Sequence, residues 1–259
     1  LRTGITIGEH AELEIIEHFA GDADVAGLTN SLTAIRLAAG ARCEHYRLQL
    51  ESGKQWHLGR VEVNQKADSS YTMHAVELGS ALSRVDVVDD LNEPGAESEL
   101  NGLFVLSGRQ HVDHHTRVAH EAPHCRSRES YRTVLDGRSH AVFNGKVVVA
   151  KGAIKTDSAQ SNSNLLLSNR AEIDTKPELE IYNDDVKCAH GATVGQLDKN
   201  QLFYLKSRGL SEEEAKQLLT FAFADELLAK MKSKPVRRYI ERAAFAKLPN
   251  LSGLEDMLT

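Results

Sequence analysis

Short runs of alternating apolar and polar residues fill most of the chain up to residue 197, and they restrict the fold more than any other feature. Runs such as EHYRLQLE (44–51), LGRVEVN (58–64) and YTMHAVEL (71–78) are separated by Gly, Ser or Asp. From 140 to 197 the separators are Asn-Gly, Ser-Asn, Lys-Pro and Asn-Asp-Asp. Alternation with a period of two is typical of β-strands. No helical period interrupts it, so the sequence predicts a mainly β protein.

Many short strands with frequent corners fit a β-sandwich, a barrel or a β-solenoid. The Asn/Ser run Ser161–Asn164, followed by Ser168-Asn169, favours the solenoid. Stacked Asn and Ser side chains at coil corners can satisfy backbone groups from one coil to the next. No strict sequence period accompanies this run, so the other two architectures stay open. The segment Leu13–Phe19 fits either a strand or a short helix.

Helical signals begin at Asp198. We expect Asp198 to be the N-cap of a first helix that ends at Gly209, a residue suited to a helix C-terminus. Ser211–Glu214 has the form of a capping box for a second helix, which we expect to run to about Ser233. Pro235 then lies in the first turn of a third helix. The sequence therefore predicts a long β body followed by a small helical cap.

Composition and missing motifs exclude several classes of function. The chain has 31 Lys and Arg against 37 Asp and Glu, a net charge of −6, which argues against binding nucleic acid. No apolar run approaches the roughly 18 residues that a membrane helix needs. No phosphate-binding loop, GxGxxG fingerprint or GxSxG elbow occurs. A single Trp and 5% aromatic residues argue against a β-helix enzyme that acts on polysaccharides, which would need aromatic sugar platforms.

Cys188-Ala189-His190 is a candidate metal site. On a strand, Cys188 and His190 would point to the same side, which suits a shared soft metal or an activated thiolate. Two ligands cannot hold iron or zinc, so the others would come from another segment or another chain. The alternative is a buried Cys beside a corner His. The three cysteines lie far apart and form no CxxC pair, which favours a reducing compartment such as the cytoplasm.

A second candidate is the histidine-rich segment QHVDHHTRVAHEAPH (110–124). If it forms a strand, His111, Asp113 and His115 share one face. The simpler interpretation is a set of turn and strand-edge residues with local hydrogen bonds, because a shared face is not yet coordination. The alternative is a stand-alone metal-binding protein that uses the segment from His111 to His124.

The stretch from RTVLDGRSHAVFNGK (132–146) through KCAHGATVGQL (187–197) to SEEEAKQLL (211–219) resembles the SufB/SufD family of iron–sulfur cluster assembly proteins. The similarity runs from about Leu103 to Leu248, and QHVDHHTRVAH is closer to the SufD branch. The resemblance implies a right-handed parallel β-helix core over 1–197 and a C-terminal helical subdomain over 198–259. It also implies an N-terminal helical region ahead of this sequence, in agreement with a first residue that is not Met.

The resemblance further implies a non-enzymatic scaffold subunit in a complex with a SufB-type subunit and a SufC-type ABC ATPase. Pairing of the chain with itself is a further possibility. Cys188 and His190 match the element at the interface with the SufB-type subunit, where a transient iron–sulfur cluster forms and iron is acquired. We expect no cofactor bound stably by the isolated chain, and no nucleic-acid or membrane partner. The residues expected to dock the ATPase are Leu202, Phe203, Tyr204, Arg208 and Leu218.

Overall fold

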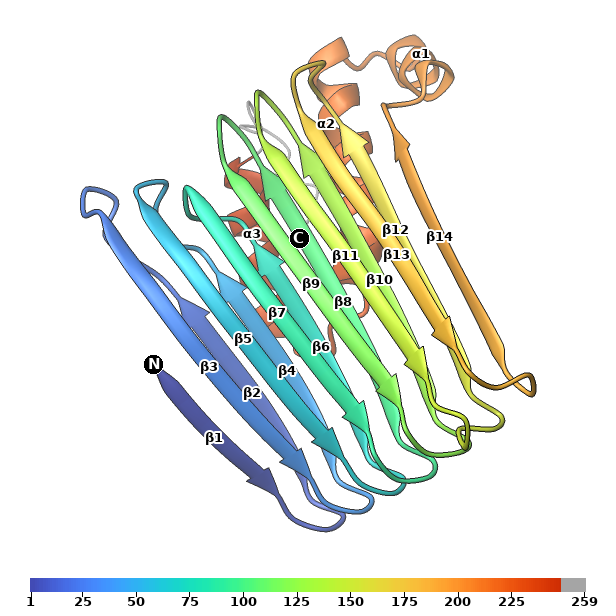
Figure 1. Ribbon diagram of the computed structural model, residues 1–259. Helices are drawn as coiled ribbons and strands as arrows, with labels where there is room; N and C mark the ends of the chain where they lie inside the picture. The colour runs from blue at the N-terminus through green and yellow to red at the C-terminus, as the bar shows by residue number, and fades with distance from the viewer. Residues whose placement is uncertain (248–259) are drawn as a thin grey trace.

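The computed structural model describes residues 1–247, in which fourteen strands wind into a coil and three helices follow (Figure 1). The strands are β1 (Arg2–Ile7), β2 (Glu12–Phe19), β3 (Gly27–Leu37), β4 (Arg42–Gln49), β5 (Gln55–Gln65), β6 (Ser70–Glu77), β7 (Leu82–Leu91), β8 (Glu97–Leu106), β9 (His111–His120), β10 (Arg126–Leu135), β11 (His140–Val149), β12 (Asp157–Leu166), β13 (Glu172–Ile181) and β14 (Lys187–Gly195). The helices are α1 (Lys199–Ser207), α2 (Glu212–Leu228) and α3 (Lys234–Lys247).

The strands form two parallel sheets that face each other. The odd-numbered strands form one sheet in the order β1-β3-β5-β7-β9-β11-β13, and the even-numbered strands form the other in the order β2 to β14. Each coil contributes one strand to each sheet, and the coil is right-handed, as is usual for connections between parallel strands (Figure 1). The predicted right-handed parallel β-helix is therefore confirmed, and the sandwich and barrel alternatives are excluded.

The length of a coil varies, which explains the missing sequence period. Gln65 pairs with Leu91, 26 positions later, whereas Val149 pairs with Ile181, 32 positions later. Corners of different length take up the difference while the paired strands stay in register. Several corners depend on a left-handed backbone that favours glycine, as at Gly40 and Gly137, which have φ angles of 66° and 67°.

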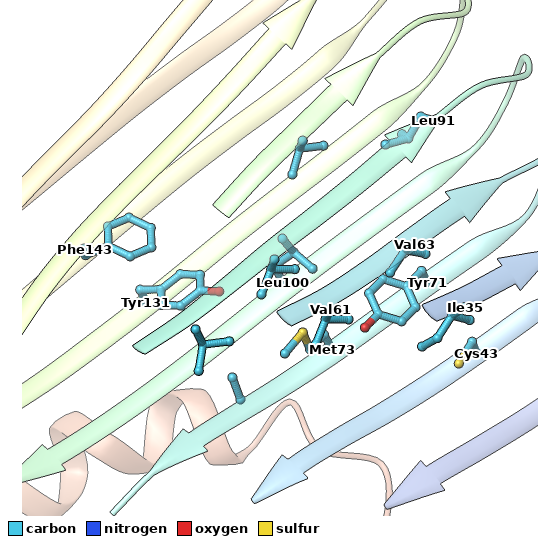
Figure 2. Packing of buried hydrophobic residues seen from close by; sticks show 14 of the residues in the cluster. Ile35, Cys43, Val61, Val63, Tyr71, Met73, Leu91, Leu100, Tyr131 and Phe143 are labelled. Atoms are coloured by element: carbon cyan, nitrogen blue, oxygen red, sulfur yellow. The ribbon is translucent and has the colours of Figure 1, made fainter. Parts of the chain in front are cut away.

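Alternation along each strand sends one set of side chains into the interior of the coil. Along β7 the buried residues alternate with half-buried ones that point outward. The interior holds a continuous apolar cluster from Ile7 to Ala171. Figure 2 shows part of it, with Tyr71, Leu100, Tyr131 and Phe143 placed between the strands along the coil. Because this side-chain set is mostly aliphatic and aromatic, its burial drives the winding of the coil.

Charged groups are also buried inside the coil. Arg47 Nη1 lies 2.8 Å from Glu77 Oε1, and their side chains are 1% and 0% exposed. His114 Nε2 lies 3.5 Å from the same Glu77 oxygen. The interaction with the nearby His114 ring and the positive charge of Arg47 hold the pKa of Glu77 at about 2, although burial alone would raise it. A buried pair of this kind is costly to break, because the remaining charge would have no partner.

Helices α2 and α3 cover the outer face of the even-numbered sheet (Figure 1). Side chains of α2 and α3, among them Leu227, Leu228 and Ile240, pack against outward-facing residues of β4, β6, β8 and β10. Arg132 on β10 donates to the Phe223 carbonyl oxygen at 2.7 Å and stacks on the Phe223 ring. These contacts fix the helices against the middle coils.

The helix signals read from the sequence are mostly confirmed. Asp198 caps α1 by accepting a hydrogen bond from the Asn200 backbone, and the Ser211–Glu214 capping box is complete at the start of α2. The expected end of the second helix near Ser233 is wrong, since α2 ends at Leu228. Just beyond it Met231 is buried in the cluster between the helices and the even-numbered sheet, and Lys230 forms an ion pair with Glu99 on β8. Residues 248–259 of the predicted helical subdomain lie outside the described residues.

The Asn/Ser run was expected at the corners, and Ser168-Asn169 does lie in the turn between β12 and β13. The expectation is wrong for the rest of the run. Ser161–Asn164 lies in the middle of β12, and Asn162 and Asn164 are buried inside the coil. The even positions of this strand point inward, so polar side chains line the interior at this coil. The ambiguous segment Leu13–Phe19 is part of strand β2. Within residues 1–247 no helix is long and apolar enough to cross a membrane.

Candidate functional site

Strand β14 is an edge of the even-numbered sheet. It pairs with β12 and, within residues 1–247, has no strand on its other side. Its residues are largely exposed, in contrast to the same positions in β12. An unpaired edge offers a row of free backbone N–H and C=O groups, and these can pair with a strand of another chain. The end of the coil therefore carries a surface suited to strand addition.

Cys188 and His190 lie on this edge strand and point to the same side. Cys188 is in register with Ser158 and His190 with Gln160, and both of these partners are buried inside the coil. The two side chains therefore face the interior at its open end, as the Cys-x-His spacing predicts. Cys188 is half-buried and His190 is exposed. Thiol and imidazole are both ligands of iron and of soft metals.

The thiol of Cys188 is predominantly protonated at neutral pH. Burial raises its pKa above the ordinary value, a hydrogen bond with the backbone of Ser158 opposes this, and the charge of Asp157 adds to the rise. Burial also raises the pKa of Cys43, to about 12, and of Cys125. Cys43 and Cys125 are 3% and 1% exposed, so Cys188 is the accessible thiol of the three. Metal binding through this sulfur would therefore require deprotonation of the thiol by a partner or by the metal itself.

Two donor side chains make an incomplete site. Within residues 1–247 no group of three or more His, Cys, Asp or Glu side chains lies close enough together to hold a metal ion. Zinc takes four ligands, and the irons of cluster proteins are held by several thiolates or imidazoles. The arrangement at β14 can therefore contribute ligands to a shared centre, and the described residues do not complete one alone.

Polar side chains line the interior behind His190. Glu129, Gln160 and His190 occupy the same ladder position in β10, β12 and β14. Burial raises the pKa of Glu129 to about 7, and the hydrogen bond from Thr116 opposes this rise. Glu129 Oε1 has no hydrogen-bond partner in the described structure. A Cβ atom on Gly145 would lie 2.0 Å from the Gln160 side-chain nitrogen. A residue without a side chain at position 145 thus leaves room for Gln160 inside the coil.

The histidine-rich segment is divided among three environments. His111, Asp113 and His115 lie on the outer face of β9, as their spacing predicts. Asp113 is already paired with Arg84 and with His115 Nε2, the latter at 2.9 Å. His111 packs edge-on against the His140 ring at a centroid distance of 4.8 Å, and burial lowers its pKa. The three residues share a face, and the ion pairs on it already engage the carboxylate.

The other histidines of this segment lie elsewhere. His114 and His120 are fully buried inside the coil, and His124 lies at a corner with a φ angle of 60°. The 15-residue segment therefore does not gather its imidazoles in one place. Alternation separates neighbouring residues to opposite faces of the strand, so closeness in sequence does not become closeness in space.

The predicted docking residues lie mainly on α1, which has no buried residue. Phe203 is 74% and Tyr204 57% exposed, which is unusual for large aromatic side chains. Arg208 stacks on the Tyr204 ring and donates to its hydroxyl at 3.3 Å. Leu202 and Leu218 are half-buried, and Leu202 lines a cavity between α1, α2 and the end of β12.

Sequence reasoning missed the residues inside the coil next to the site. Ser158 and Gln160 precede Cys188 and His190 by one coil, a separation of 30 positions that the register pairs show. A search for weak similarity at about 30 residues would have aligned SAQ (158–160) with CAH (188–190). The signal was hidden because corner lengths vary from coil to coil.

Comparison with known protein sequences agrees with this geometry. The family described as "SUF system FeS cluster assembly, SufBD core domain" matches residues 1–223. The iron–sulfur cluster assembly protein SufD of Escherichia coli is 36% identical over 248 residues, which is 96% of this chain and 59% of the relative. An iron–sulfur cluster assembly SufBD family protein of Synechocystis sp. is 40% identical over 199 residues, 77% of this chain and 44% of the relative.

A chloroplast protein of Arabidopsis thaliana, ABCI7, is 32% identical over 238 residues, 91% of this chain and 50% of the relative. The chain thus spans 44% to 59% of the length of these three relatives. The family match starts at residue 1 and so includes the first coils, upstream of the Leu103 boundary of the resemblance seen in the sequence. The chain belongs to the SufB/SufD family of iron–sulfur cluster assembly proteins and stands on its SufD side.

Proposed function

We propose that this chain is a non-enzymatic scaffold subunit that contributes half of a composite site for the assembly of iron–sulfur clusters. The observation that carries the proposal is the position of Cys188 and His190 on an unpaired edge strand, both facing the open end of the coil. The remaining ligands would come from a second subunit. The cluster is then cargo of the assembled complex, held only while it forms.

A SufB-type subunit is the partner that we propose for this edge. Addition of a strand to β14 would satisfy its free backbone groups and bring donor atoms of the second chain to Cys188 and His190. A second copy of this chain could occupy the same edge, which makes a homodimer the competing arrangement. Both arrangements place the half-site in a subunit interface, and only a partner with further thiolates or imidazoles completes it.

Helix α1 is the surface that we propose for a SufC-type ATPase. The exposed Phe203 and Tyr204 offer the aromatic anchors that are common at protein interfaces, and Arg208 next to them offers a charged contact. Leu202 and Leu218 would support the surface from below. Only residues 196–198 separate β14 from α1, so a displacement of the docked helix reaches the edge strand directly. Nucleotide-driven movement could in this way open or close the composite site, in the cytoplasm.

The experiment is co-purification with a SufB-type subunit and a SufC-type ATPase, followed by anaerobic analysis of iron and sulfide. His190→Ala is expected to abolish cluster formation and Cys188→Ala to reduce it, with complex formation intact. His140→Ala, which removes a histidine on the outer face of β11, is the matched control and should leave the iron and sulfide content unchanged. Normal cluster content in the His190→Ala complex would refute the proposal. A complex without a SufB-type subunit would favour the homodimer.

A second candidate is metal binding at His111, Asp113 and His115, which share one half-exposed face. Titration of the isolated chain with iron or zinc separates the two. Binding that is lost in the variant His111→Ala/His115→Ala and kept in His190→Ala would support this candidate. Asp113 could bind a metal only if its ion pair with Arg84 breaks, because that ion pair already engages the carboxylate.

A further inference from the structure

A buried asparagine on β12 forms a hydrogen bond with the main chain of the edge strand β14. The side-chain nitrogen Nδ2 of Asn164 donates to the Thr193 carbonyl oxygen at 3.1 Å and to Asn162 Oδ1 at 2.5 Å. Asn162 and Asn164 both point into the coil and are 1% and 3% exposed. Each of the two amide hydrogens of Asn164 thus has one acceptor. The side chain links the interior of one coil to the main chain of the next.

The acceptors determine the orientation of the Asn164 amide. A carbonyl oxygen only accepts hydrogen bonds, so the atom of Asn164 that faces the Thr193 carbonyl has to be the nitrogen. Asn164 Oδ1 has no hydrogen-bond partner in the described structure, and a flipped amide would place its two hydrogens there. A buried N–H without an acceptor is rarer in proteins than a buried oxygen without a donor. The hydrogen bond to β14 therefore runs from the side chain to the strand.

The second half of β14 has few other attachments to the coil. Residues 191–195 are exposed, and a Cβ atom on Gly191 or Gly195 would have no atom within 4 Å. Glycine weakens a strand, because it packs against nothing and regains the most freedom when the strand opens. Apart from the backbone ladder with β12, no other side chain among residues 1–247 forms a hydrogen bond with this half of the strand. One buried bond can therefore supply a large share of its attachment.

The position of Asn164 at the end of the coil explains why an amide suits it. The same ladder position holds Thr133 on β10 and Phe104 on β8, and Phe104 belongs to the apolar cluster of the interior. Packing of this kind needs neighbours on both sides. Within residues 1–247 no strand follows β14, so an apolar side chain would pack against one side only. A hydrogen bond needs a single acceptor, and it can hold a terminal strand where packing is incomplete.

Thr193 lies between the half-site and helix α1. It follows His190 by three residues, about 10 Å along a strand, and α1 begins at Lys199. We propose that Asn164 is a positioning residue of the assembly site, which keeps the second half of β14 on the coil and so fixes the strand that carries His190. A displacement of α1 then has to break this hydrogen bond before it moves Cys188 and His190. The role in cluster assembly rests on the function proposed above, whereas the attachment of β14 does not.

The test is hydrogen–deuterium exchange of the isolated chain, followed at the backbone amides of residues 191–195. Asn164→Leu keeps the number and arrangement of side-chain heavy atoms and removes the donor. Loss of this hydrogen bond should make these amides exchange about fivefold faster, while the amides of β6 and β8 keep their rates. Asn164→Ala removes the donor without adding apolar surface and should show the same local acceleration. The nuclear magnetic resonance signal of the His190 amide should shift and broaden in both variants, which a loss of global stability alone would not cause.

Thr133→Val is the matched control. Thr133 lies one coil further in at the same ladder position, and its buried hydroxyl has no hydrogen-bond partner in the described structure. It should leave the exchange of residues 191–195 and the His190 signal unchanged. Wild-type exchange of these residues in Asn164→Leu or in Asn164→Ala would overturn the proposal. Equal acceleration in β6, β8 and β14 would show a global loss of stability and would overturn it as well.

The attachment of β14 and the proposed function can fail separately. Exchange needs no partner and no cluster, so the attachment is judged on the isolated chain. The function is judged by the iron and sulfide content of the His190→Ala complex. If both hold, the complex with Asn164→Leu should contain less cluster than the complex with Thr133→Val. Equal cluster content in these two complexes would refute the positioning role of Asn164.

Discussion

Replacement of Glu129 by Gln should make the folded chain more stable at neutral pH than at acid pH, relative to the wild type. Glu129 is fully buried on β10, and burial raises its pKa from 4.5 to about 7. The folded state therefore binds the Glu129 proton more tightly than the unfolded state does. As pH rises from about 4.5 to 7, the wild type loses stability, because folding must either keep the proton or bury a charge. Gln has the same shape and no charge, so this loss is absent.

The expected magnitude follows from the two pKa values. A difference of about 2.5 pKa units corresponds to about 3 kcal/mol, and it develops at up to about 1.4 kcal/mol per pH unit. At pH 5 the unfolded wild type is already mostly ionised at this position, so Glu129→Gln should be more stable by only about 1 kcal/mol. At pH 8 Glu129→Gln should be more stable by about 3 kcal/mol. The Thr116 hydroxyl, which donates to Glu129 Oε2 at 2.6 Å, can donate equally to the Gln carbonyl oxygen.

The assay is urea unfolding of both proteins at pH 5, 6, 7 and 8, with the difference in free energy of unfolding plotted against pH. The buried histidines titrate in both proteins, so their contributions cancel in the difference. Glu121→Gln, at an exposed position, is the control and should follow the wild type at every pH. A difference between Glu129→Gln and the wild type that does not change with pH would refute the reasoning.

Three further changes probe the fold. Arg47→Met and Glu77→Gln should each lower the free energy of unfolding in urea by about 3–5 kcal/mol, because each change leaves a buried group without its ion-pair partner. The double variant should lose clearly less than the sum of the two, and additive losses would contradict this. Gly102→Ala should lower the stability by about 1–3 kcal/mol in thermal unfolding, because the added Cβ would lie 2.1 Å from a ring carbon of Tyr131. Gly152→Ala, whose Cβ would have no atom within 4 Å, should be nearly neutral. Equal losses of stability in the two variants would contradict this. Ser211→Ala removes the capping box of α2 and should cost about 1 kcal/mol, read from unfolding followed by helical circular dichroism; an unchanged midpoint would count against it.

The sequence predicted the architecture through local patterns that the structure keeps. Alternation along β7 and β9 fixed which residues face inward, and the caps at Asp198 and Ser211 fixed where two helices begin. It also placed Cys188 and His190 on one side of a strand. These features depend on neighbours in the sequence, which is why a single sequence contains them.

Features that depend on contacts between coils could not be predicted. Asn162 was expected at a corner, yet it lies inside the coil, where the partner strand decides what is buried. Arg47 and Glu77 form an ion pair across two adjacent strands, although they are 30 positions apart in the sequence. The sequence of either strand alone does not predict this pair. Just past the end of α2 at Leu228, Met231 packs into a cluster with residues of β4, β6, β8 and β10. In each case the deciding partner is distant in the sequence.

The packing of α2 and α3 across β4, β6, β8 and β10 has a consequence for cooperativity. In a solenoid each coil contacts only its neighbours, so the ends fray more easily than the middle. Because the two helices pack across several coils, we expect these coils to unfold cooperatively. β14 lies beyond these strands and, within residues 1–247, pairs with no strand other than β12. Its amide hydrogens should exchange through local fraying, so a partner can reshape this end while the rest of the coil keeps its global protection.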